Sequence, residues 1–161
     1  MKREKYNFDC EVFESIDLLP KDIQHMIALA EDQLNYSYAP YSNFLVGAAA
    51  MLDNGEIHTG CNQENASYPL CICAERVALY SVGSKHKEFK IKALAITAHN
   101  PAKPNEDPCT PCGACRQVIQ EFEHRQDGPI TLYLTGDSGK ILKIEGIKNI
   151  LPLSFSMNNL L

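Results

Sequence analysis

Two short segments, far apart in the sequence, together carry the residue types of a catalytic zinc site. They read CAER at residues 73–76 and PCGACR at residues 111–116. Their cysteines are Cys73, Cys112 and Cys115. Three thiolates can hold a zinc ion whose fourth position stays open to water, and Glu75, a nearby carboxylate that is not a ligand, can carry that water's proton. The pattern therefore predicts an enzyme that uses zinc to activate water.

The spacing of these residues also predicts where they lie on helices. Pro111 suits the first turn of a helix, so Cys112 and Cys115, three residues apart, are expected to share one helical face. Cys73 is expected to open a second helix. Unpaired backbone N–H groups at the two helix starts can donate to the sulfurs, and both helix dipoles place positive potential there.

Arg76 is the basic residue that we expect to support this site. It lies three residues after Cys73, on the same predicted helical face. Three thiolates give a zinc site a net negative charge, which weakens the metal as a Lewis acid. We predict that the Arg76 guanidinium donates to ligand sulfurs and withdraws charge from them. The alternative is that Arg76 only solvates a helix surface.

Four of the seven cysteines lie outside the predicted ligand set. Cys10 and Cys61 are expected to be small buried hydrophobic residues. Cys71 and Cys109 lie beside the predicted ligands. Because the run from Cys109 to residue 115 has the spacing of the first three ligands of a bacterial ferredoxin, an iron–sulfur cluster is a rival interpretation. Its fourth ligand is missing, since Ile119 stands where a cysteine is needed.

Hydrophobic periodicity predicts the elements that must position these residues. Alternation predicts a short strand within residues 6–12, and helical spacing predicts an amphipathic helix over residues 23–34. Further strands are expected at 44–52, 56–59, 91–98, 130–134 and 141–144, and further helices from 73 to 82 and from 112 to before Gly128. The Asn54-Gly55 step favours a tight hairpin turn. This order predicts an α/β fold in which helices cover a mixed sheet.

Length, composition and charge narrow the class of protein. The 161 residues, 45% of them hydrophobic, fit one compact enzyme domain over residues 21–161, after an N-terminal extension of residues 1–20 that could add a strand. A net charge of −5 argues against a polynucleotide partner and favours a free small molecule. No apolar run approaches a membrane span, and charged residues follow the basic start, so we expect a cytoplasmic protein with reduced or metal-bound cysteines.

Four motifs in order resemble the small-subunit, homotetrameric type of cytidine deaminase, from about residue 36 to 155. Besides the two cysteine segments they are YAPYSNFLVGAA at 38–49 and GCNQENASY at 60–68, and the ending LPLSF at 151–155 also matches. The resemblance implies a three-layer α/β/α sandwich with a five-stranded mixed sheet. It also implies zinc-dependent hydrolysis of cytidine and 2′-deoxycytidine to uridine and 2′-deoxyuridine, with release of ammonia, in pyrimidine salvage.

The resemblance assigns roles to individual residues. Cys73, Cys112 and Cys115 would hold zinc, and Glu75 would be the proton shuttle. Asn62 and Glu64 would bind the ribose hydroxyls, Phe44 would contact the pyrimidine, and the backbone around Ala74 would read the base. Phe155 would stack on a base bound by a neighbouring subunit.

Other readings of these residues stay open at the level of sequence. Asn62 and Glu64 also suit a solvated polar loop, Phe44 suits a core position, and Phe155 suits subunit packing alone. A deaminase of another aminopyrimidine nucleoside could share every motif. A non-catalytic zinc or iron–sulfur module is disfavoured by Glu75, because a closed structural site needs no adjacent carboxylate.

Overall fold

The computed structural model describes residues 1–86, 88 and 90–160. Its helices are α1 (Lys21–Asp32), α2 (Ala74–Lys85) and α3 (Gly113–Gln126). Its strands are β1 (Glu11–Phe13), β2 (Leu45–Leu52), β3 (Ile57–Cys61), β4 (Ile91–His99), β5 (Thr131–Leu134) and β6 (Ile141–Glu145). The predicted helices and the strands from residue 44 onward are confirmed, with ends that differ by a few residues.

In the described part of the chain the strands form one mixed sheet in the order β1-β6-β5-β4-β2-β3. The pair β4–β5 is parallel and every other neighbouring pair is antiparallel. The parallel pair is joined through α3, as a crossover requires. The sheet is mixed, as predicted, but it has six strands where five were expected.

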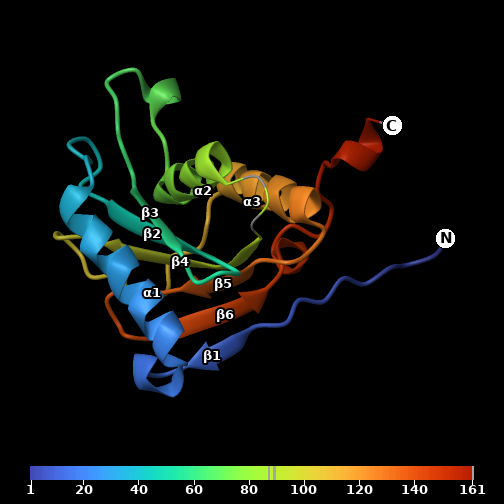
Figure 1. Cartoon of the computed structure of the whole chain (residues 1–161), viewed down its shortest axis with the longest axis horizontal. Helices are drawn as coiled ribbons and strands as arrows, with labels where there is room; N and C mark the ends of the chain where they lie inside the picture. The colour runs from blue at the N-terminus through green and yellow to red at the C-terminus, as the bar shows by residue number, and fades with distance from the viewer. Residues whose placement is uncertain (87, 89, 161) are drawn as a thin grey trace.

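The additional strand is β1, at the edge of the sheet next to β6. Glu11 pairs with Lys143 and Phe13 with Ile141. The expected strand within residues 6–12 is therefore misplaced. Pairing stops at Glu11 although β6 continues to Glu145, because the chain leaves the strand edge there: Asp9 N donates to Asn149 Oδ1 at 3.3 Å, beyond the end of β6. The N-terminal arm extends away from the body of the molecule (Figure 1), and Tyr6 is 57% exposed.

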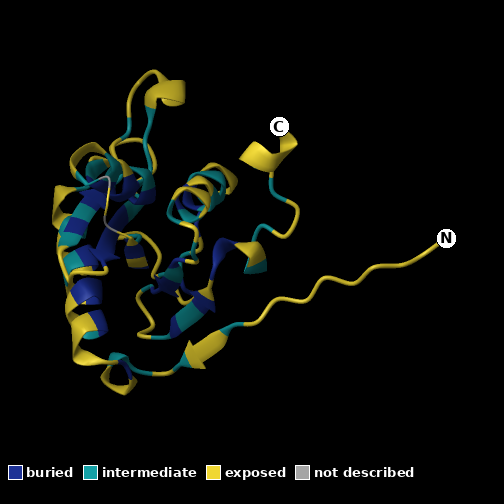
Figure 2. Ribbon diagram, turned by 45° about the vertical axis from the view of Figure 1, so that its right-hand side comes forward, coloured by how far each residue is buried: buried dark blue, intermediate teal, exposed yellow. Residues whose placement is uncertain are grey.

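The helices lie on both faces of the sheet and bury two apolar layers. Helix α1 covers one face, and α2 and α3 lie side by side on the other (Figure 1). The stripe of α1 that packs against the sheet consists of residues at helical spacing: Ile23, Met26, Ile27 and Ala30. The buried residues of Figure 2 accordingly lie between the sheet and the helices. The predicted three-layer α/β/α sandwich is confirmed.

Gly60 in β3 sets how closely α2 approaches the sheet. A Cβ atom at this position would lie 2.6 Å from Ala78 N and 2.8 Å from Ala74 O. Both are backbone atoms of α2, so no side-chain rotation could relieve the clash. Glycine therefore lets the first turns of α2, where the predicted site begins, pack directly on the strand. Among the helices that the structure describes, none combines the length and apolarity needed to cross a membrane.

Candidate active site

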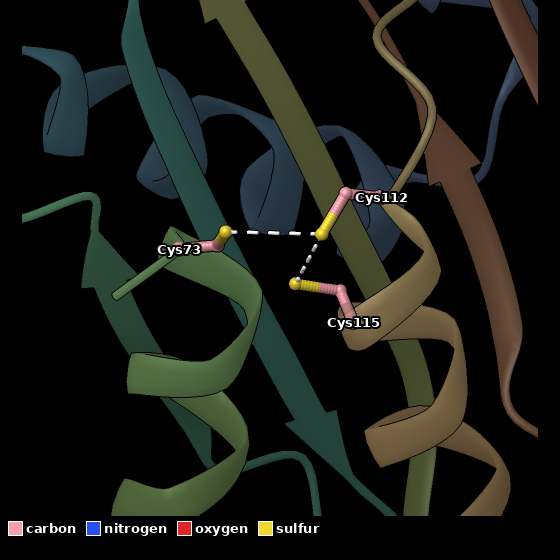
Figure 3. Close-up of side chains that lie close together, drawn as sticks. All are labelled: Cys73, Cys112 and Cys115. Carbon is pink, nitrogen blue, oxygen red and sulfur yellow. Dashed lines mark hydrogen bonds between the residues drawn. The ribbon is translucent and has the colours of Figure 1, made fainter. Parts of the chain in front are cut away.

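Helices α2 and α3 bring the three predicted ligands together at their N-terminal ends (Figure 3). Cys73 is the N-cap of α2, Cys112 is the N-cap of α3, and Cys115 lies in the first turn of α3. The Sγ atoms of Cys73 and Cys112 are 3.9 Å apart, those of Cys112 and Cys115 are 3.5 Å apart, and all three lie within 4.8 Å of one another. We call these residues the thiol cluster.

The thiol cluster fits a zinc ion. In a tetrahedral site, Zn–S bonds of about 2.3 Å place two sulfur atoms about 3.8 Å apart. The two measured separations, 3.9 and 3.5 Å, lie close to that value. Three thiolates leave the fourth tetrahedral position for water, which is the arrangement of catalytic rather than structural zinc sites.

Neighbouring groups favour a thiolate at the position of Cys73. The adjacent Cys115 thiol and, against the opposing effect of burial, the Arg76 guanidinium lower the pKa of Cys73 to about 5. The same interaction with Cys73, together with burial, raises the pKa of Cys115. Metal binding to such a set replaces the shared protons. The side chains of Cys73 and Cys112 make no N-cap hydrogen bond, so the expected donation from the backbone at these caps is not observed.

The structure places Arg76 beside the thiol cluster. Its Nη2 atom donates to Cys73 Sγ at 3.5 Å and to the carbonyl oxygen of Cys71 at 3.4 Å. Within the described residues, the buried Nε atom has no hydrogen-bond partner. The contact with Cys73 matches the geometry that the sequence predicts, and the withdrawal of charge from the ligand sulfurs stays a prediction.

Glu75 is a buried carboxyl group next to these ligands. It lies in the first turn of α2 and is only 4% exposed. Burial raises the pKa of Glu75, and the negative charge of Cys73 adds to that effect. A carboxyl group whose pKa is raised toward neutral pH suits proton transfer. Together with Cys73, Cys112 and Arg76, Glu75 lines a cavity of about 330 Å³.

Three of the predicted substrate-binding residues line the same cavity: Phe44, Asn62 and Glu64. Asn62 also holds the backbone, because its Oδ1 accepts from Val46 N and its Nδ2 donates to Phe44 O, both at 2.9 Å. Ala74 is fully buried beside Glu75. Phe44 is half-buried and packs against the core. Phe44 therefore packs against the core and also lines the cavity.

Glu64 is fixed by the loop before β2. Its Oε2 accepts from Tyr41 N at 2.8 Å and from Ser42 N at 3.3 Å. The hydrogen bonds from Ser42 and Tyr41 hold the pKa of Glu64 below its usual range, so it is an anionic acceptor at neutral pH. An ionised, oriented carboxylate is suited to accept from hydroxyl groups of a ligand.

Phe155 lies apart from this cavity. It is 59% exposed, and within the described residues it is not part of the cavity lining. Two residues that the sequence analysis missed hold the tail on α3. Gln117 Nε2 donates to Phe155 O at 2.8 Å, and Arg116 Nη1 donates to Ile150 O at 2.9 Å. One feature of the sequence could have drawn attention to Arg116 and Gln117: they directly follow Cys115, the last predicted metal ligand.

The remaining cysteines do not complete an iron–sulfur site. Cys71 and Cys109 both line the cavity, but among the described residues neither belongs to a group of side chains that could hold a metal ion. Burial raises the pKa of Cys109 to about 11, so its thiol stays neutral. Cys61 is buried, as expected, whereas Cys10 is only half-buried. The ferredoxin-like spacing therefore has no four-thiolate counterpart in this part of the chain.

Comparison with known proteins places the chain in a family. The cytidine and deoxycytidylate deaminase zinc-binding region matches residues 20–126. A cytidine deaminase of Sporosarcina psychrophila is 40% identical over 140 residues, covering 86% of this chain and 95% of the relative. The cytidine deaminase of Halalkalibacterium halodurans is 36% identical over 139 residues, covering 86% and 98%.

Solved structures agree with the sequence comparison. The crystal structure of cytidine deaminase from Burkholderia pseudomallei superposes with a TM-score of 0.69 at 38% identity, covering 81% of this chain and 97% of that one. Cytidine deaminase from Mycobacterium tuberculosis gives a TM-score of 0.66 at 30% identity, covering 85% and 99%. The fold and the zinc-binding region thus define a deaminase-type α/β/α protein. The chain belongs to the cytidine and deoxycytidylate deaminase family.

Proposed function

We propose that this protein is a zinc-dependent hydrolase that deaminates cytidine and 2′-deoxycytidine to uridine and 2′-deoxyuridine, releasing ammonia, in pyrimidine salvage. The observation that carries the proposal is a buried Glu75 beside three converging cysteines at one cavity. The names of the relatives above support the choice of base.

In this proposal Glu75 moves the protons of the reaction. When held by the thiol cluster, zinc would lower the pKa of a water molecule and so supply the nucleophile. Glu75 accepts the proton of that water and delivers it to the ring nitrogen next to C4, which makes C4 electrophilic. The second proton of the water goes to the amino group as it leaves. Water and cytidine are thus consumed, and uridine and ammonia are formed.

Arg76 has a positioning role in the proposed reaction. Its contact with Cys73 Sγ draws electron density from that thiolate. A ligand set with less negative charge leaves the metal a stronger Lewis acid.

The other cavity residues would hold the nucleoside. The fixed carboxylate of Glu64 accepts from ribose hydroxyls, and Asn62 has one N–H and one lone pair beyond its two backbone bonds. Phe44 supplies an apolar face for the pyrimidine, and the backbone at Ala74 reads the base edge. These contacts recognise a neutral nucleoside and require no phosphate-binding residue.

We also propose the assembly and the setting of the enzyme. Residues 21–161 form one deaminase domain, and residues 1–20 are an extension that contributes β1. Exposure of Phe155 fits a homotetramer in which this ring enters a neighbouring chain's cavity. All seven cysteines are free, which fits a cytoplasmic location.

The test is ammonia release from a panel of nucleosides by protein whose zinc content has been measured. We expect turnover of cytidine and 2′-deoxycytidine, with about one zinc per chain at the thiol cluster. If another aminopyrimidine nucleoside is turned over and these two are not, the protein is a related deaminase with a different substrate. If zinc-loaded protein releases no ammonia from any nucleoside of the panel, the protein is a non-catalytic metal-binding module.

A further inference from the structure

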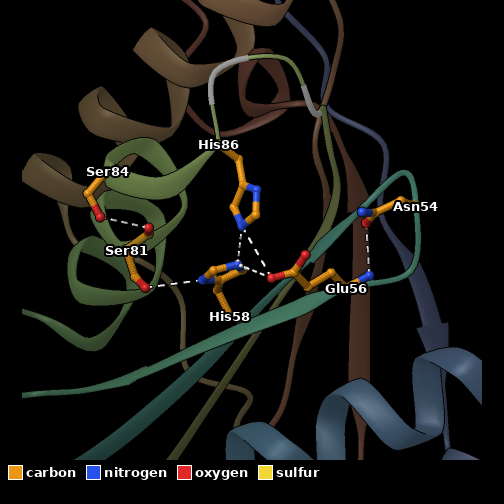
Figure 4. A network of polar contacts seen from close by, with 6 residues as sticks. All are labelled: Asn54, Glu56, His58, Ser81, Ser84 and His86. Atoms are coloured by element: carbon orange, nitrogen blue, oxygen red, sulfur yellow. Dashed lines mark hydrogen bonds and ion pairs between the residues drawn. The ribbon is translucent and has the colours of Figure 1, made fainter.

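A second group of metal-competent side chains lies at the other end of α2, away from the thiol cluster. Glu56 lies in the hairpin that leads into β3, His58 lies in β3, and His86 caps the C-terminal end of α2 (Figure 4). His58 Nε2 is 3.1 Å from Glu56 Oε1 and 2.9 Å from His86 Nε2, and His86 Nε2 is 3.2 Å from Glu56 Oε1. We call these residues the histidine cluster.

The three atoms of the histidine cluster converge on one point. Metal–ligand bonds of about 2.0–2.1 Å in a tetrahedral zinc site place nitrogen and oxygen ligands about 3.3–3.4 Å apart. The observed separations, 2.9 to 3.2 Å, are slightly shorter, so the atoms need to move apart by only a few tenths of an ångström. Two imidazoles and one carboxylate are a known ligand set for zinc.

A neighbouring hydroxyl is placed to support the tautomer that this chemistry requires. His58 Nδ1 lies 3.1 Å from Ser81 Oγ on α2. If Nδ1 carries the ring proton and donates it to Ser81, Nε2 is left as a lone-pair donor that faces the cluster. Ligating histidines usually have such a partner on the second ring nitrogen, because it orients the ring.

The three side chains of the histidine cluster differ in how far they are exposed to solvent. The side chain of His58 is 5% exposed, that of His86 17%, and that of Glu56 47%. His58 is thus held by the protein, while a cation can arrive from the side of Glu56. The backbone N–H of Glu56 donates to Asn54 Oδ1 at 2.9 Å, which fixes the turn that carries the carboxylate.

We propose that Glu56, His58 and His86 form a second binding site for a divalent cation of the zinc class, separate from the thiol cluster. A bound cation replaces the polar contacts that join the three atoms in its absence. The fourth position faces solvent and is filled by water. Binding joins the β2–β3 hairpin to the end of α2, so it stabilises the helix whose first turn carries the catalytic residues.

The experiment adds Co²⁺ to protein that already holds zinc at the thiol cluster. Tetrahedral cobalt absorbs visible light, and cobalt bound by cysteine also gives a sulfur-to-metal charge-transfer band. We expect about one further equivalent of Co²⁺ with visible absorption and no sulfur band. His86→Gln and Glu56→Gln should each weaken this binding by at least about tenfold, the lower limit seen for the loss of a supporting residue around a metal.

Matched controls separate this site from surface binding. His25→Gln and His124→Gln remove exposed histidines on α1 and α3 and should leave the cobalt titration unchanged. Cobalt or zinc should raise the melting temperature of the wild-type protein and not that of His86→Gln. The proposal is wrong if His86→Gln and Glu56→Gln both fold and bind Co²⁺ as tightly as the wild type. It is also wrong if the wild-type protein takes up no second equivalent of Co²⁺, or if that cobalt shows the sulfur band.

Discussion

The two ends of helix α2 carry two clusters of opposite chemistry. Three sulfur atoms gather at its N-terminal end, and two imidazoles with one carboxylate gather at its C-terminal end. The positive end of a helix dipole stabilises thiolates, whereas the negative end favours cations and protonated histidine. Each cluster therefore lies at the end of the helix whose potential suits it, and one helix can support both.

The difference also lies in how each cluster is assembled. The thiol cluster uses N-caps and a first helical turn, so helix starts define it. The histidine cluster joins a strand residue, a hairpin residue and a helix C-cap, and it exists only because β3 packs along α2. Burial does not distinguish them, because each cluster combines one buried, one half-buried and one exposed residue.

The largest expected effect is loss of the catalytic metal. Cys73→Ala, Cys112→Ala and Cys115→Ala should each release zinc and abolish deamination, because two thiolates no longer close the site. Cys71→Ala and Cys109→Ala, which remove neighbouring thiols, should keep about one zinc. Metal analysis by mass spectrometry checks both sets, and zinc retained in any of the first three variants would show that a neighbouring thiol is the ligand.

The next effect separates proton transfer from structure at the same end of α2. Glu75→Gln should keep zinc and the fold but lower kcat by at least about a hundredfold, the lower range for removal of a general acid–base. The matched control is Glu123→Gln on α3. There the amide oxygen can still accept from Ile130 N and Ile147 N, so activity should stay near that of the wild type. Steady-state kinetics with near-normal turnover of Glu75→Gln would rule out the shuttle.

Local patterns were sufficient for the thiol cluster and most of the fold. Cys112 and Cys115 are three residues apart at a helix start, and the Asn54-Gly55 step does form the turn between β2 and β3. Such signals act within a few residues, where backbone geometry alone fixes which side chains meet. The chain before Glu11 was harder, because the alternation of its side chains does not say where pairing with β6 stops.

Contacts between distant segments were beyond the reach of the sequence. His58 and His86 are separated by most of β3 and all of α2, and no periodicity brings their rings together. Asn62 looked like a ligand-binding or loop residue, yet its amide also joins the backbone of Phe44 and Val46. The sequence carries no local signal for either arrangement, because both depend on the packing of β3 against its neighbours.

A smaller effect is expected from Gly60→Ala, which disturbs only the first turns of α2. The new Cβ would meet Ala78 N at 2.6 Å, so the strand and the helix must move apart. Overpacking of this kind costs about 1–3 kcal/mol in the free energy of unfolding. Urea denaturation measures it, and zinc should bind more weakly while the histidine cluster keeps its cobalt affinity. Equal weakening at both clusters would mean that the two ends of α2 respond as one unit.

The smallest effect is expected for Phe155. The histidine cluster is complete within one chain, whereas the proposed active site also uses this ring from a neighbouring chain. Phe155→Ala should raise KM while zinc content stays unchanged. Base stacking on an aromatic ring is worth about 1–3 kcal/mol in nucleic-acid complexes, which corresponds to about a tenfold rise or somewhat more. Nucleoside titrations measure KM, and light scattering measures the oligomeric state.

Mixing two inactive or weakened variants tests whether the ring acts in a neighbouring chain. Glu75→Gln chains keep Phe155, and Phe155→Ala chains keep Glu75. In hybrid tetramers, some cavities receive a functional Glu75 from one chain and an intact Phe155 from another, so part of the activity should return with the KM of the wild type. An active monomer would contradict this arrangement. So would a mixture in which subunit exchange is demonstrated and tight substrate binding does not recover, because the ring would then serve its own chain or only the packing of subunits.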